Sequence, residues 1–168
     1  MPSQPTIVVG RPEAFSKEDR RKFIELVIAG GEVVNAVLDA NVNEARCLVF
    51  LSLRDQFLGV AALKNPRSTY RARIQRNTGA ELGMHDFPYE LGYVYLIPSA
   101  REKGYSRRLT EAALSECGHH GVFATCRADN ERMRASLRRH GFLEAGQAYR
   151  GRIQGQFLRL FLRPGAQT

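Results

Sequence analysis

The chain has 168 residues, of which 43% are hydrophobic and 25% are charged. This length and composition indicate one globular domain with a buried core, and they exclude a disordered chain. No apolar run approaches the roughly 20 residues that a membrane-spanning helix needs. The formal net charge of +8 predicts attraction to an anion, which can be a nucleotide cofactor, a nucleic acid or an acidic protein.

The start of the chain and its cysteines predict the compartment. The first ten residues, MPSQPTIVVG, lack the positively charged and then apolar regions of a secretory signal. Cys47, Cys117 and Cys126 are an odd number without close pairing, so a disulfide framework is not expected. We therefore expect a cytoplasmic protein.

The chain opens with a predicted strand and a capped helix. The strand, TIVVG, occupies residues 6–10. The helix begins after Ser16, which is followed by Asp19 in the manner of an N-terminal capping pair, and it ends at Gly30 and Gly31.

Three further segments complete the first half. A shorter helix is predicted over EVVNAVLDAN, residues 32–41, and two strands around a tight turn are predicted over ARCLVFLSLRDQFLGVAAL, residues 45–63. Residues 64–88 are basic and rich in turn formers. We predict an ordered or semi-ordered loop there, with a helical turn near residues 71–76, and loops of this length are often functional.

The second half alternates strands and helices. Strands are predicted over residues 89–98, 121–129, 142–151 and 156–165, and helices over residues 106–121 and 130–141. The whole chain, 1–168, is therefore predicted to be a single mixed α/β (α+β) domain, with a mostly antiparallel, twisted sheet of six to seven strands and about four helices.

The turn AREKGYSRR between a strand and a helix is the strongest functional signal. The first N–H groups of a helix lack partners within the helix, and the helix dipole makes that end electropositive. Gly104 allows backbone conformations that other residues avoid, so successive N–H groups can face one oxyanion. With Arg101, Lys103 and Arg107 around it, the turn is a candidate phosphate or pyrophosphate site. The alternative is an ordinary glycine turn with solvated basic residues.

The surrounding motifs resemble the acetyl-CoA-binding half of the GNAT N-acetyltransferase superfamily. Arg101, Gly104 and Ser106 match the Q/R-x-x-G-x-G/A motif that lies between the family's fourth strand and third helix, with Ser106 in place of Gly or Ala. Asn130 precedes the pair Gly141-Phe142, as a family asparagine does. The resemblance extends from about residue 90 to residue 142, and it implies a GNAT-like fold whose sheet splays between strands 4 and 5 after a bulge.

The resemblance also implies a cofactor and a reaction. The cofactor is acetyl-CoA, with coenzyme A as product, and the reaction is transfer of the acetyl (acyl) group to a primary amine by direct attack in a ternary complex. The implied cofactor-binding residues are Leu96, Ile97, Arg101, Lys103, Gly104, Tyr105, Ser106, Arg107 and Asn130.

Acyl transfer to an amine needs a base, an oxyanion donor and a proton for the leaving sulfur. Some members of the family place a carboxylate on strand 4 where this chain has Glu90, which makes it the candidate base. The alternative for Glu90 is a solvated residue at the start of a strand. The backbone N–H of Leu96 or Ile97 is the candidate oxyanion donor.

The general acid departs from the family pattern. Many members carry a tyrosine seven residues after the motif asparagine, and here that position is Leu137. Ser136 and His140 are the candidate substitutes, and water is a third way to protonate the thiolate. The departure keeps a second hypothesis open, in which the chain is a basic nucleic-acid- or protein-binding module on the same fold with weak or no acyltransferase activity.

The resemblance implies that the segment between strands 3 and 4 borders the acceptor groove. Basic residues there would favour an acidic acceptor, such as a carboxylate-bearing metabolite, an acidic peptide or a nucleic acid. The alternative is a solvated, charged loop. The candidate acceptor-binding residues are Arg67, Arg71, Arg73, Tyr93 and Tyr95, and for the two tyrosines on strand 4 core packing is the alternative.

Two further features bear on metals and partners. Cys117, His119 and His120 have no second cluster to support a metal site, so no metal is expected. The last strand, with Phe157 and Leu160, alternates imperfectly, and burial against a second copy in a homodimer would explain that.

Overall fold

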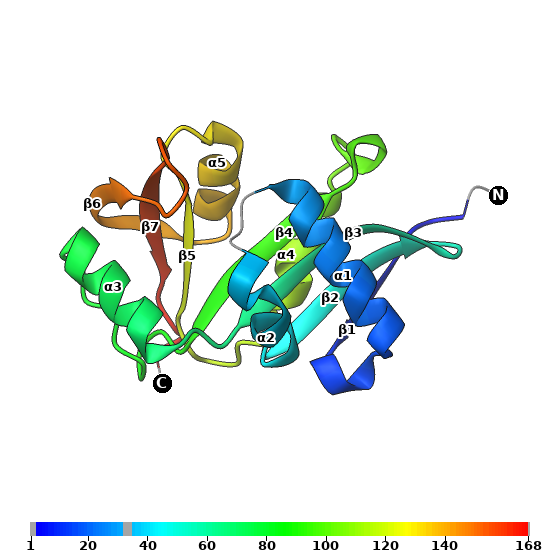
Figure 1. Ribbon diagram of the computed structural model, residues 1–168, viewed down its shortest axis with the longest axis horizontal. Coiled ribbons are helices and arrows are strands. Elements are labelled where there is room, and N and C mark those ends of the chain that lie inside the picture. Colours follow the sequence, from blue (N-terminus) through cyan, green and yellow to red (C-terminus); the bar gives the residue numbers. More distant parts are fainter. Residues whose placement is uncertain (1–2, 32–34, 168) are drawn as a thin grey trace. The chain divides into compact units, whose positions relative to one another are not determined.

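The computed structural model describes residues 3–31 and 35–167 (Figure 1). The fold is mixed α/β, as predicted, with seven strands in the order β1-β2-β3-β4-β5-β7-β6. The chain divides into two compact units, Met1–Lys64 with Leu91–Glu116, and Asn65–Glu90 with Cys117–Thr168. Strand β4 (Tyr89–Leu96) therefore has its first two residues in the second unit and the rest in the first.

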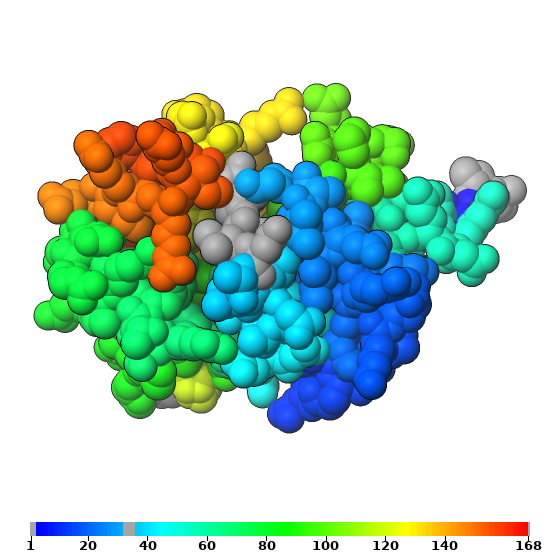
Figure 2. All heavy atoms as spheres, in the orientation of Figure 1, coloured from blue at the N-terminus to red at the C-terminus, as the bar shows by residue number. Residues whose placement is uncertain are grey.

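The first unit is a sheet with helices on both faces. Strands β1 and β2 and strands β2 and β3 pair antiparallel, and the hairpin of β2 and β3 lies where the sequence predicts it. In Figure 1, α1 and α2 lie in front of these strands and α4 behind them, so α1 (blue) and α2 (cyan) form the surface seen in Figure 2. The elements are β1 (Thr6–Gly10), α1 (Lys17–Gly30), α2 (Leu38–Asn43), β2 (Cys47–Leu53), β3 (Gln56–Lys64) and α4 (Tyr105–Leu114), with short 3-10 helices at Pro12–Ala14, Asn35–Val37 and Pro98–Ala100.

The ends of α1 follow the predicted capping. The Ser16 hydroxyl accepts a hydrogen bond from the Asp19 N–H at 3.0 Å, and Gly31 ends the helix with a left-handed backbone, φ 71°. Helix α1 buries Phe23 and Val27 against Phe50 of β2. The predicted second helix is a 3-10 turn followed by α2, and its first residues, 32–34, lie outside the described part of the chain.

The second unit contains the other end of the strand order and has a hydrophobic core of its own. Strand β7 lies between β5 and β6, antiparallel to both, and β4 pairs with β5 in parallel at Tyr89↔Val122 and Glu90↔Phe123. Because the rest of β4 belongs to the first unit, the splay between β4 and β5 stays a prediction. The elements are α3 (Ser68–Thr78), β5 (Val122–Arg127), α5 (Glu131–Arg139), β6 (Leu143–Arg150) and β7 (Phe157–Arg163).

The structure corrects one prediction. The segment predicted as a loop contains an eleven-residue helix, α3, that ends at Gly79 with φ 75°. Its buried positions, Arg71, Ile74 and Thr78, have helical spacing, but only Ile74 is apolar. The hydrophobic periodicity that predicts a helix is therefore almost absent.

Two further findings concern membrane-spanning helices and the cysteines. Within the described residues, no helix is both long and apolar enough to span a bilayer. Cys47, Cys117 and Cys126 are buried free thiols, and burial raises the pKa of Cys47 to about 11.

Candidate active site

The turn between β4 and α4 has an unusual backbone. Both Glu102 and Gly104 are left-handed, with φ of 63° and 77°. A left-handed backbone is costly for residues other than glycine, so the surrounding fold constrains this turn. A Cβ built on Gly104 would meet no atom within 4 Å. The space in front of Gly104 is therefore open.

The N-terminus of α4 faces solvent without a side-chain cap. Gly104 occupies the N-cap position and supplies no capping oxygen, and its carbonyl accepts from Arg108 N–H at 3.4 Å. The first N–H groups of the helix, which begin at Tyr105, have no partner within it. An uncapped, electropositive helix end beside an open left-handed glycine fits a phosphate or pyrophosphate group.

The predicted basic residues surround this turn. Arg101, Lys103 and Arg107 are exposed. Arg101 donates to the Leu96 carbonyl at 3.1 Å, and Arg107 pairs with Glu111 at 2.7 Å. The Arg101 contact ties the side chain back to the end of β4.

Strand β4 is distorted where the family resemblance implies a bulge. Tyr93 has a left-handed backbone, φ 57°, inside a strand, which is rare for a bulky residue. Beyond it, the Ile97 N–H donates to the Leu58 carbonyl of β3 at 2.9 Å. This hydrogen bond excludes the Ile97 N–H as the oxyanion donor, because that N–H already has an acceptor. The Leu96 N–H is the remaining candidate.

The tyrosines of β4 pack on the core of the first unit. Tyr93 lies edge-on to Phe23, with ring centroids 6.3 Å apart, and the Lys64 ammonium lies 4.5 Å from the Tyr93 ring centre. Tyr95 also packs against this core, and the Arg101 guanidinium lies 5.6 Å from its ring centre. Both side chains are half-buried. These contacts show the core-packing role, and a role in the acceptor site stays a prediction.

Glu90 is a buried carboxylate in the second unit. Its exposed fraction is 2%, so the interpretation of Glu90 as a solvated residue is wrong. The Tyr70 hydroxyl of α3 donates to the Glu90 carboxylate at 2.7 Å. Burial, the charge of Glu90 and this hydrogen bond raise the pKa of Tyr70 well above its usual range. Tyr70 is the residue that the sequence interpretation missed, because its helix was predicted as a loop.

The basic residues of α3 divide into two kinds. Arg71 is 5% exposed, and its guanidinium donates to the carbonyls of Leu82 and Phe87 at 3.1 and 2.7 Å. It therefore holds the segment after α3, and this corrects its assignment to acceptor binding. Arg67 is exposed and Arg73 is half-buried, with its guanidinium 5.7 Å from the Tyr70 ring centre.

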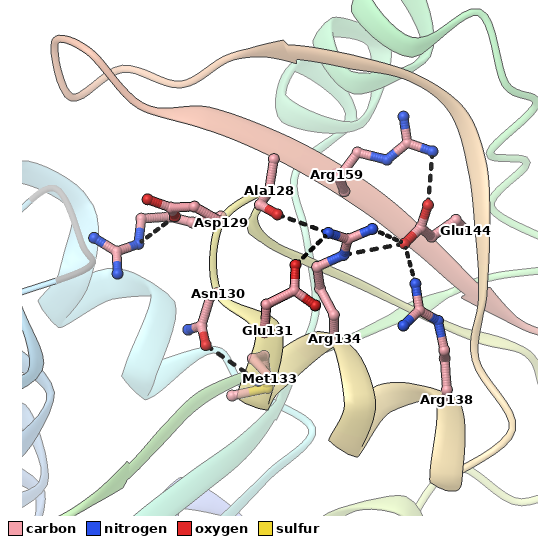
Figure 3. Close-up of polar contacts among 10 residues, drawn as sticks. Ala128, Asp129, Asn130, Glu131, Met133, Arg134, Arg138, Glu144 and Arg159 are labelled. Atoms are coloured by element: carbon pink, nitrogen blue, oxygen red, sulfur yellow. Dashed lines mark hydrogen bonds and ion pairs between the residues drawn. The ribbon is translucent and has the colours of Figure 1, made fainter.

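Helix α5 carries the motif asparagine and the candidate acids. The Asn130 side-chain oxygen accepts from Met133 N–H at 3.1 Å and caps the helix (Figure 3). Leu137 is buried in the core of the second unit. His140 is half-buried, with Nδ1 2.8 Å from the Ser136 carbonyl, which can only accept, so Nδ1 donates.

A charge cluster joins α5 to strands β6 and β7 (Figure 3). Arg134 and Arg138 of α5 each reach Glu144 of β6 at 2.7 Å, and Arg159 of β7 reaches its other oxygen at 3.0 Å. These guanidinium groups lower the pKa of Glu144, mainly through the hydrogen bonds from Arg134. The cluster ties α5 to both strands of the hairpin.

We expect Glu144→Gln to lower the free energy of unfolding at pH 7 by about 1 to 2 kcal/mol, since three guanidiniums lose their shared anion while water screens part of the effect. The folded pKa of Glu144 is depressed, so its stabilisation is present above its usual value and is lost as pH falls through the depressed pKa. Denaturant unfolding from pH 7 to pH 3 measures this, and the variant should lose less stability than the wild type over that range. Glu131→Gln is the matched control, because Glu131 pairs with Arg134 at the exposed surface. An equal loss in both variants would contradict the account.

No metal cluster is found: across residues 3–31 and 35–167, no group of three or more His, Cys, Asp or Glu side chains lies close enough to hold an ion. The ring centroids of His119 and His120 lie 4.4 Å apart. On the last strand, β7, Phe157 is half-exposed and Leu160 is buried. A homodimer stays a prediction.

Known structures share this fold. An acyl-CoA N-acyltransferase from Pseudomonas aeruginosa aligns with a TM-score of 0.70 and 15% identity over 95% of this chain and 99% of that one. YncA from Salmonella typhimurium, with its cofactor acetyl-CoA, aligns with a TM-score of 0.68 and 17% identity over 99% and 96%. Naa50 from Arabidopsis thaliana, in complex with the bisubstrate analogue CoA-Ac-MVNAL, aligns with a TM-score of 0.66 and 12% identity over 94% and 97%.

The sequence comparisons assign the family. No curated protein matches the chain significantly. The family model described as acetyltransferase (GNAT) family matches residues 11–142, which are most of the chain. The protein therefore belongs to the acetyltransferase (GNAT) family.

Proposed function

We propose that the protein transfers an acetyl group from acetyl-CoA to a primary amine. The observation that carries the proposal is the uncapped N-terminus of α4 beside the open, left-handed Gly104. Membership of the family supports it, as does a structural neighbour that holds acetyl-CoA. When bound, acetyl-CoA supplies the acyl group as a reactive thioester.

The residues of the turn would hold the cofactor's pyrophosphate. The backbone N–H groups of Gly104, Tyr105 and Ser106 would donate to its oxygens, and Arg101, Lys103 and Arg107 would add positive charge. Because the Asn130 side-chain oxygen caps α5, the side-chain amide nitrogen of Asn130 would be the group that contacts the cofactor.

The catalytic groups follow from the same proposal. Glu90 would accept a proton from the acceptor's ammonium group, and the Leu96 N–H would stabilise the oxyanion. The leaving sulfur would take its proton from Ser136, His140 or water. Since Leu137 is buried and apolar, it cannot donate a proton.

The acceptor is proposed to be an amine that also bears acidic groups, because the exposed Arg67 lies at the N-cap of α3 and the helix carries Arg73. An acetylation assay with three peptides of equal length, acidic, neutral and basic, each with one free α-amine, tests this. We expect the acidic peptide to have the lowest KM. Arg67→Gln together with Arg73→Gln should remove that preference and leave KM for acetyl-CoA unchanged.

Equal KM values for the three peptides would contradict an acidic acceptor. Transfer to none of them, with salt-sensitive RNA binding that coenzyme A does not affect, would instead favour the nucleic-acid-binding module.

A further inference from the structure

Helix α3 brings a phenol to the candidate base. The Tyr70 hydroxyl lies 2.7 Å from a Glu90 carboxylate oxygen, and Glu90 is 2% exposed. We propose that Tyr70 is a positioning residue, whose hydroxyl holds the Glu90 carboxylate in the orientation in which it accepts the acceptor's proton. The inference rests on the proposed function, in which Glu90 is the base.

The donor direction of this hydrogen bond is fixed. A carboxylate can only accept, so Tyr70 donates. Its phenol pKa is raised well above 10 by burial and by the neighbouring negative charge, so the hydroxyl stays protonated at neutral pH. Tyr70 therefore acts as a constant donor to Glu90 rather than as a group that exchanges its own proton.

The phenol is presented by a rigid element. Arg71, next to Tyr70, anchors α3 by donating to the carbonyls of Leu82 and Phe87. Ile74, one turn further, is fully buried in the same core that the Tyr70 ring packs against. A side chain on a packed helix is held more rigidly than one on a loop. A donor that positions a catalytic carboxylate needs this rigidity.

A second tyrosine lies in the same core and provides the control. Tyr149 of β6 belongs to the buried cluster that the Tyr70 ring packs against. Tyr149 is 6% exposed, and burial together with the charge of Glu90 raises its pKa above the usual range. Tyr149 lies in the same core as Tyr70, whereas the hydrogen bond to the Glu90 carboxylate comes from the Tyr70 hydroxyl.

The step that Tyr70 supports is a proton transfer. One N–H bond of the acceptor's ammonium group breaks, its electron pair stays on nitrogen, and the proton bonds to a carboxylate oxygen of Glu90. The neutral amine then has the lone pair that attack on an acyl carbon needs. An orientation error of about 1 Å in such a group can cost about 10²-fold in rate.

The experiment compares Tyr70→Phe with Tyr149→Phe. The first readout needs no cofactor or acceptor: it is the side-chain carboxyl carbon resonance of Glu90 at pH 7, assigned by its loss in Glu90→Gln. Tyr70→Phe should move this resonance, and Tyr149→Phe should leave it in place. An unmoved resonance in Tyr70→Phe would overturn the contact itself.

The second readout is the kinetics of transfer to the acidic peptide. We expect Tyr70→Phe to lower kcat by about 10- to 100-fold, the loss expected for a hydrogen bond to a charged group, with both KM values unchanged. Tyr149→Phe should keep kcat. A moved resonance with an unchanged kcat would overturn the positioning role and leave acetyl transfer standing.

Two checks keep the outcomes distinct. Failure of the proposed function appears separately, as absence of transfer by the wild-type protein. If Tyr70→Phe does not fold, 3-fluorotyrosine at position 70 keeps the hydroxyl with a stronger donor, and it should move the Glu90 resonance while retaining kcat. An unmoved resonance there would also overturn the proposal.

Discussion

Gly104→Glu is expected to abolish coenzyme A binding while the protein remains folded. The new side chain would place bulk and negative charge in the open space in front of Gly104, where the pyrophosphate is proposed to lie. The left-handed backbone adds a cost of roughly 1–2 kcal/mol, which a domain with a stability of about 5–15 kcal/mol can bear. Calorimetric titration with coenzyme A measures binding, and circular dichroism measures folding.

Gly118→Glu is the matched control for this variant. Gly118 is also left-handed, with φ 60°, and a Cβ there would likewise meet no atom within 4 Å. It belongs to the second unit and follows α4 in the chain, whereas Gly104 precedes that helix. Its left-handed backbone carries the same cost for a residue other than glycine, so this variant should lose a similar amount of stability. Equal affinity for coenzyme A in the wild type and Gly104→Glu would contradict the proposal that the turn at Gly104 holds the pyrophosphate.

Glu90→Gln is expected to lower kcat for acetyl transfer by about 10²- to 10⁴-fold, the usual contribution of a general base. The amide oxygen can still accept the Tyr70 hydroxyl, so the packing around this buried position should persist. Acetyl-CoA affinity should not change, because Glu90 is not among the residues proposed to hold the cofactor. Steady-state kinetics and calorimetry measure these two quantities.

Glu81→Gln controls for loss of a carboxylate in the same unit, because Glu81 is exposed after α3, and it should retain full kcat. A loss of less than threefold in Glu90→Gln would mean that another group or water is the base. The buried Glu90 would then be a structural anchor for α3.

The parts of the fold that depend on local chemistry could be predicted from the sequence. Ser16 and Gly31 mark the ends of α1 because a hydroxyl cap and a left-handed glycine are local signals. The start of α4 could be predicted in the same way, since Gly104 occupies its N-cap position with a left-handed backbone. These features depend on neighbours within a few residues.

The missed features depend on contacts between distant segments. Helix α3 is stabilised by the buried guanidinium of Arg71, which donates to carbonyls 11 and 16 residues further along the chain. From the sequence alone, an arginine is expected to lie at the surface. The Ile97 N–H donates to a carbonyl of β3, and no sequence pattern near Ile97 predicts this hydrogen bond. Tyr70 and Glu90 are 20 residues apart, and only the folding of α3 brings them together.

Calorimetric titration of the purified protein with acetyl-CoA, desulfo-coenzyme A and ATP tests whether the turn at Gly104 binds coenzyme A. We expect micromolar binding of acetyl-CoA and desulfo-coenzyme A and much weaker binding of ATP, because the pantetheine arm adds contacts that a nucleotide triphosphate lacks. Absence of acetyl-CoA binding, or equal affinity for ATP, would contradict this expectation and would mean that the turn at Gly104 binds another anion.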